Sequence, residues 1–112
     1  MTSHTGHNHP ATTAARTACR KETRALRIKA AAFLRTAEGR GTFAYEWAMG
    51  KIPGAAVRLG ALTDDEAFGT WGYLNGEWVK VIPCQLSTID ILVAIYRKTP
   101  TFSWDMFCRM YS

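Results

Sequence analysis

The chain has 112 residues, of which 47% are hydrophobic and 21% charged, and its formal net charge is +5. This length predicts a single domain with one modest core, and the composition is that of an ordinary globular protein. The longest strongly apolar run, Ile89 to Tyr96, contains Asp90 and is far too short to span a bilayer, so we expect no membrane partner.

Positive charge is concentrated in the amino half. Residues 1–60 contain ten basic and three acidic residues, a net charge of +7, whereas residues 61–112 have a net charge of −2. A positively charged amino half favours nucleic acid, anionic lipid or an acidic protein surface as partner.

The chain has three cysteines, Cys19, Cys84 and Cys108, which is an odd number, and they are widely spaced. Together with a polar amino end that has no signal peptide, they predict reduced thiols and a cytoplasmic location.

Residues 1–10 have the composition of a flexible polar tail and contain three histidines. If Met1 is removed, His4 becomes the third residue, an arrangement that suits square-planar Cu(II) or Ni(II). A plain disordered tail is the stronger interpretation. We therefore expect no metal cofactor, with His4 as the weak alternative.

A helix is predicted from Ala11 to about Glu38, because this stretch lacks Gly and Pro and is rich in Ala, Arg and Lys. On a helical wheel one apolar arc of about 60° contains Ala15, Cys19, Leu26, Ala30, Phe33 and Ala37. A separate arc of about 100° contains five arginines: Arg16, Arg20, Arg24, Arg27 and Arg35. Ile28 and Leu34 fall in or beside the basic arc, so part of it could be packed.

Two shorter helices are expected next. The first covers Thr42–Met49, capped by Thr42 and ended by Gly50, with Phe43 and Trp47 packed on the long helix. Pro53-Gly54 predicts a turn before a brief helical segment that Gly60 ends. The second helix begins at a capping box, Thr63 to Glu66, and ends at Gly69.

A β-hairpin is predicted over residues 70–82, because Asn75-Gly76 is the preferred pair for a type I′ turn. The turn fixes a register in which Tyr73 faces Trp78 and Trp71 faces Lys80. One face then presents Trp71, Tyr73, Trp78, Lys80 and Ile82, and the other presents Leu74, Val79 and Val81. Because both faces are apolar, we expect helices to cover the hairpin, while an exposed aromatic face would be a secondary contact surface.

Two helices complete the chain. Ser87 to Asp90 resembles a capping box, and the apolar segment after it predicts a buried helix that ends at Thr99-Pro100. The last helix places Trp104, Phe107, Cys108 and Tyr111 on one side. The fold class is therefore α+β: a compact domain of residues 11–112 whose hairpin packs against the long first helix and the two carboxyl-terminal helices.

No catalytic signature is present. The histidines all lie in the tail, and the sequence has no P-loop, no dinucleotide fingerprint and no zinc spacing. We therefore expect a non-enzymatic protein without a cofactor.

Binding is the better-supported class of function. Arginines one helical turn apart suit a row of phosphates, so we predict binding of DNA, RNA or another polyanion through the five arginines. The alternative is a protein that binds and regulates or inhibits a larger machine, of the kind carried by phages and plasmids, such as an anti-defence protein. The sequence leaves open the choice among DNA, RNA and protein, and the oligomeric state.

Overall fold

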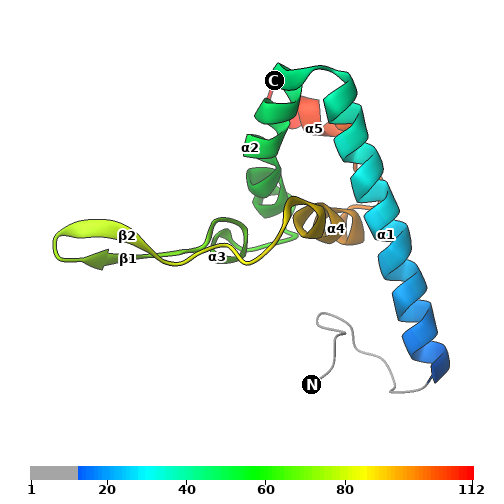
Figure 1. The fold of residues 1–112 in the computed structure, drawn as a ribbon, viewed down its shortest axis with the longest axis horizontal. Helices are drawn as coiled ribbons and strands as arrows, with labels where there is room; N and C mark the ends of the chain where they lie inside the picture. Colours follow the sequence, from blue (N-terminus) through cyan, green and yellow to red (C-terminus); the bar gives the residue numbers. More distant parts are fainter. Residues whose placement is uncertain (1–12) are drawn as a thin grey trace.

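The computed structural model describes the backbone of residues 13–112 and the side chains from residue 17 onward. The elements, in chain order, are α1 (Thr13–Gly39), α2 (Thr42–Arg58), α3 (Asp64–Phe68), β1 (Thr70–Leu74), β2 (Glu77–Ile82), α4 (Thr88–Lys98) and α5 (Trp104–Met110). The protein is helix-rich α+β with a long first helix and one two-stranded sheet, which confirms the predicted class (Figure 1).

Helix α4 is the centre of the helical body and packs against both α1 and α2. Leu92 and Ile95 are fully buried, as expected for a segment that is apolar nearly all round. The predicted capping box is present: the Ser87 hydroxyl accepts from the backbone N–H of Asp90, whose carboxylate accepts from the backbone N–H of Ser87. This reciprocal cap fixes where α4 begins.

The predicted apolar face of α1 is also confirmed within the described side chains. Leu26, Phe33 and Cys19 are buried, and Ala30 and Ala37 have no exposed surface. This face and the buried side of α4 belong to one hydrophobic core, which also includes residues of α2 and α5.

Helix α2 differs from the prediction. It runs without interruption through Gly50, Pro53 and Gly54, so neither the stop at Gly50 nor the turn at Pro53-Gly54 is correct. Its N-cap is Gly41 rather than Thr42, and no side chain caps it. The reason is packing: α2 buries Ala48, Ile52, Ala55 and Ala56 in the core, and this burial outweighs the poor intrinsic helix propensity of two glycines and a proline.

The aromatic side of α2 packs differently from the prediction. Trp47 is in the body, but its ring contacts are with α5 rather than with the long helix: its ring lies 5.2 Å from that of Phe107 and 6.3 Å from that of Trp104. Phe43, however, is 87% exposed and does not pack on α1. One helical turn separates the two residues, and α5 reaches only the position of Trp47.

The hairpin has the predicted register, with Tyr73 opposite Trp78 and Trp71 opposite Lys80. Asn75 and Gly76 have φ values of 51° and 83°, the positive values that a type I′ turn requires. The capping box of α3 and its end at Gly69 are likewise confirmed. Local sequence signals therefore determine the pairing from the turn as far as Trp71 and Lys80. Beyond that point the register shifts, and Thr70 lies opposite Ile82.

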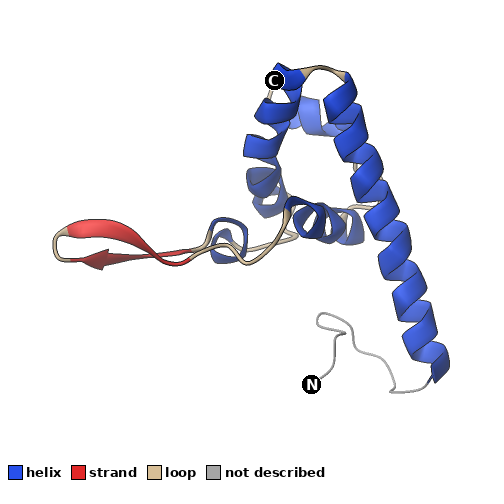
Figure 2. Cartoon of the chain, in the orientation of Figure 1, coloured by secondary structure: helices blue, strands red, loops and turns tan. Residues whose placement is uncertain are grey.

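The expected helical cover over the hairpin is wrong. β1 and β2 project away from the helical body, which Figure 2 shows as a red ribbon at one end of the molecule. On this ribbon Tyr73 is 65% and Trp78 67% exposed. The aromatic residues that the sequence placed beneath a helix lie on the surface, and the buried core consists of helix residues together with Phe102, which lies between α4 and α5.

Candidate binding surfaces

The arginine face of α1 is defined here as Arg20, Arg24 and Arg35, which are exposed. Their guanidinium groups make no hydrogen bond, ion pair or ring contact with any residue that the structure describes. Along the helix axis Arg20 and Arg24 are about 6 Å apart, and Arg20 and Arg35 about 22 Å. Folding does not explain these three charges, so they remain available for a partner.

The other two predicted arginines have different positions. Arg27 is not free: its Nη1 lies 3.4 Å from Asp90 Oδ1 in the first turn of α4. Arg16 lies within α1, but its side chain is outside the described residues. The partner of Arg27 is 63 residues away in the chain, so helical periodicity could not reveal it.

A second ion pair joins α1 and α4. Arg97 Nη1, near the end of α4, lies 2.5 Å from Glu22 Oε1 on α1. Together with the pair of Arg27 and Asp90, it fixes both ends of α4 across α1. Both pairs are partly exposed, so each contributes at most about 1 kcal/mol and serves mainly to orient the helices.

Two apolar residues beside the arginine face differ in burial. Leu34 is partly buried and packs on the core, whereas Ile28 is 60% exposed. The face is therefore not purely charged, because Ile28 adds an apolar surface next to the arginines.

Most other basic side chains of the amino half cover aromatic rings of the body. Arg40 lies over the Trp104 ring at 5.4 Å, and Lys51 and Arg58 lie over the Tyr111 ring at 5.4 and 4.6 Å. Arg58 Nη1 also donates a hydrogen bond to the carbonyl oxygen of Met110. These cations hold α5 against α2 through cation–π contacts, so they form no part of the arginine face.

The hairpin is the second candidate surface. On one face of it the Tyr73 and Trp78 rings meet edge to face at 5.4 Å, and Lys80 Nζ lies 5.4 Å from the centre of the Trp71 ring. The shared face of these four residues is as predicted, and its aromatic side chains are exposed rather than part of the core. Both faces of the ribbon are exposed, since Leu74 and Val81 are each 60% accessible.

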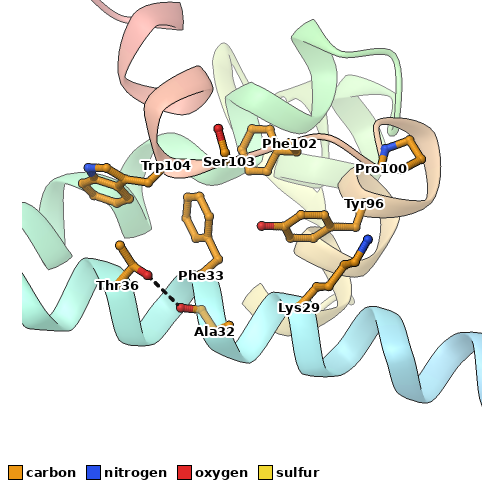
Figure 3. Close-up of a pocket in the computed structure, with 9 residues that line it drawn as sticks. All are labelled: Lys29, Ala32, Phe33, Thr36, Tyr96, Pro100, Phe102, Ser103 and Trp104. Carbon is orange, nitrogen blue, oxygen red and sulfur yellow. Dashed lines mark hydrogen bonds between the residues drawn. The ribbon is translucent and has the colours of Figure 1, made fainter.

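A hollow of about 300 Å³ opens between α1, the end of α4 and the start of α5. Figure 3 shows the Phe33, Tyr96 and Phe102 rings grouped in this hollow, with Lys29 at one rim. Burial raises the pKa of Tyr96, so its phenol stays neutral in the folded protein. Sequence reasoning missed the hollow, because its walls come from segments about 60 residues apart.

The remaining polar side chains of the described residues bear on the predictions of metal and cysteine sites. Within the described part of the chain, no three His, Cys, Asp or Glu side chains are grouped as metal ligands, and His4 lies outside it. Cys84 Sγ donates to the carbonyl oxygen of Glu66 at 3.3 Å, which joins the exit of β2 to α3. In residues 13–112 there is also no helix of the length and apolarity that crossing a bilayer requires.

The fold and these surfaces define a small helix-rich α+β protein with a basic helix face and a projecting aromatic hairpin. Comparisons with family models, curated proteins and solved structures found no match for the chain. The two surfaces are therefore the features of the protein from which a function can be inferred.

Proposed function

We propose that this protein is a non-enzymatic binder of nucleic acid, or of another polyanion, through the arginine face of α1. The observation that carries the proposal is the absence of any described partner for Arg20, Arg24 and Arg35 in a protein whose net charge is +5. Exposed guanidinium groups bind phosphate through two parallel hydrogen bonds, which makes Arg well suited to such a surface.

The geometry supports a phosphate backbone as the ligand. The three arginines extend over about 22 Å of helix axis, and along the axis of a duplex each strand carries one phosphate about every 3.4 Å. Several phosphates therefore lie within reach of the face at once. Recognition of this kind is positional and does not read sequence, so the proposal predicts little discrimination among base sequences.

The test is equilibrium binding of a labelled 20-base-pair DNA duplex and of a single-stranded RNA at low salt, measured by fluorescence anisotropy. The variant R20A/R24A/R35A should bind at least about tenfold more weakly than the wild type, because it loses three phosphate contacts. Failure of the wild type to bind either nucleic acid at low salt would disprove the proposal.

A matched variant controls for net charge. K51A/K98A/R109A also removes three positive charges, from exposed positions on α2, α4 and α5 that belong to neither candidate surface. If the arginine face is the site, this control should retain most of the wild-type affinity. Equal losses in the two variants would show that only the overall charge of the protein matters.

A second candidate is a regulator or inhibitor of a larger protein machine, with an acidic protein surface against the same face. The exposed Ile28 favours it, because protein interfaces combine arginine with apolar contact area. A stoichiometric protein partner that co-purifies with the chain after nuclease treatment, and not with R20A/R24A/R35A, would support this candidate over nucleic acid.

A further inference from the structure

The hollow between α1, the end of α4 and the start of α5 has walls of aromatic rings. Four rings line it: those of Phe33, Tyr96, Phe102 and Trp104. The Phe33 ring lies 5.3 Å from the Phe102 ring and 5.6 Å from the Trp104 ring. The Tyr96 ring meets the Phe102 ring edge to face at 5.5 Å. Because each ring packs against another, the fold itself holds the walls in place, and the volume of about 300 Å³ lies at the lower end of the range for small-molecule pockets.

One polar group in the hollow has no partner. Tyr96 is only 7% exposed, and its hydroxyl makes no hydrogen bond with any residue that the structure describes. Figure 3 shows the phenolic oxygen directed into the hollow, toward Phe33. Burial also raises the pKa of this phenol, so it keeps its proton and can donate a hydrogen bond. Because a buried tyrosine O–H normally has a partner, this one is suited to an acceptor atom on a ligand.

Lys29 supplies positive charge at the rim of the hollow. Its Nζ lies 5.8 Å from the centre of the Tyr96 ring, and it forms no ion pair with a residue that the structure describes. Among the described residues that line the hollow, no other is charged. The charge of the site therefore favours an anion over a cation. The lysine stem is flexible, so the ammonium can follow a charged group that binds near the rim.

We propose that this hollow binds a small aromatic carboxylic acid, with its ring against Phe33 and Phe102 and its carboxylate between the Tyr96 hydroxyl and Lys29. Aromatic rings pack favourably in tilted or offset arrangements, and the walls offer such contacts to a planar ligand. The carboxylate accepts a hydrogen bond from the phenol, and the ammonium adds a charge-assisted contact. No lining residue belongs to the arginine face or to the hairpin, so this site goes beyond polyanion binding.

The test is a titration of the isotope-labelled wild type with phenylacetate to about 10 mM, followed by NMR of the backbone amides. We expect the amides of Lys29, Phe33 and Trp104 to shift and to saturate with a dissociation constant below about 1 mM, while those of the hairpin stay unchanged. Two analogues test the two halves of the ligand. Acetate, which lacks the ring, should give no saturable shift, and phenylacetamide, which lacks the charge, should bind at least about threefold more weakly.

Two variants each remove one proposed contact. Y96F deletes only the phenolic hydroxyl and should raise the dissociation constant about tenfold, because a hydrogen bond to a charged acceptor is lost. K29A, at an exposed position on α1, should raise it about threefold. The matched controls make the same changes outside the hollow, Y73F on the hairpin and K21A on α1. Both controls should keep the wild-type affinity.

Three results would each overturn the proposal: no saturable shift with phenylacetate, equal binding of acetate, or lining variants that bind as well as their controls. Shifts confined to amides outside the hollow would overturn it too. The titrations contain no nucleic acid, so their result is independent of polyanion binding.

Discussion

Phe107 and Phe43 are the same residue type in opposite surroundings. Phe107 is fully buried, with the Trp47, Phe33 and Tyr111 rings at 5.2, 5.4 and 5.6 Å from its own. Phe43 is 87% exposed. At the scale of single residues, stability therefore depends on the aromatic cluster around Phe107, which joins α1, α2 and α5.

Phe107→Ala should lower the free energy of unfolding by about 3 to 5 kcal/mol, because it removes a buried ring and leaves a cavity. Phe43→Ala should change it by no more than about 0.5 kcal/mol. Urea unfolding followed by circular dichroism measures both. Similar losses in the two variants would contradict the packing described for α2 and α5.

Tyr96 adds a dependence of stability on pH. Burial raises its pKa, so in alkaline solution the unfolded chain loses the phenolic proton before the folded protein does. The folded state then binds more protons than the unfolded state, and stability falls as the pH rises above the ordinary tyrosine pKa of about 10. Tyr96→Phe should reduce this fall, which is measured as the midpoint of unfolding at a series of alkaline pH values. If the midpoints of variant and wild type fall in parallel with pH, Tyr96 does not contribute to the pH dependence of stability.

At the scale of elements, α2 is where local propensity and packing disagree. Gly50 and Pro53 predict breaks, yet the helix continues because Ile52 and its alanine neighbours are buried against α4. Where no such conflict exists, as in the caps of α3 and α4 and the Asn75-Gly76 turn, the predicted elements agree with the structure. Contacts between distant segments decide the cases in which local signals fail.

Gly50→Ala tests the continuity of α2. Gly50 is an exposed position inside the helix, and an added Cβ would have no atom within 4 Å. The variant should gain up to about 1 kcal/mol in free energy of unfolding, since Ala is the better helix former. Gly69→Ala is the matched control and should have the opposite effect. Gly69 has a φ of +88°, and an added Cβ would lie 2.6 Å from the Ile82 carbonyl oxygen, so this variant should lower the free energy of unfolding. No gain from Gly50→Ala would indicate a break in α2.

At the scale of the whole molecule, exposure was the property that sequence could not predict. A ribbon that is apolar on both faces has the same pattern whether helices cover it or leave it projecting. For the same reason the wheel showed five equivalent arginines, although Arg27 is paired with Asp90 from a distant segment. The class of fold and the basic face were predictable because they depend on periodicity and charge; the composition of the face depends on tertiary contacts.

The proposed binding of nucleic acid or another polyanion is a prediction at the scale of the whole charged molecule, and the salt dependence of the affinity would separate a defined site from general attraction. Each phosphate contact adds about 0.9 to the slope of log K against log salt concentration for duplex DNA. A variant that lacks three contacts should therefore have a slope smaller by about 2 to 3.

The most direct test of the central proposal is this slope, measured for the wild type, R20A/R24A/R35A and K51A/K98A/R109A on one duplex. We expect the slope to fall by about 2 to 3 only in the variant of the arginine face, with the control keeping the wild-type value. Identical slopes in the two variants, or an unchanged slope in R20A/R24A/R35A, would contradict the assignment of the arginine face as the binding site.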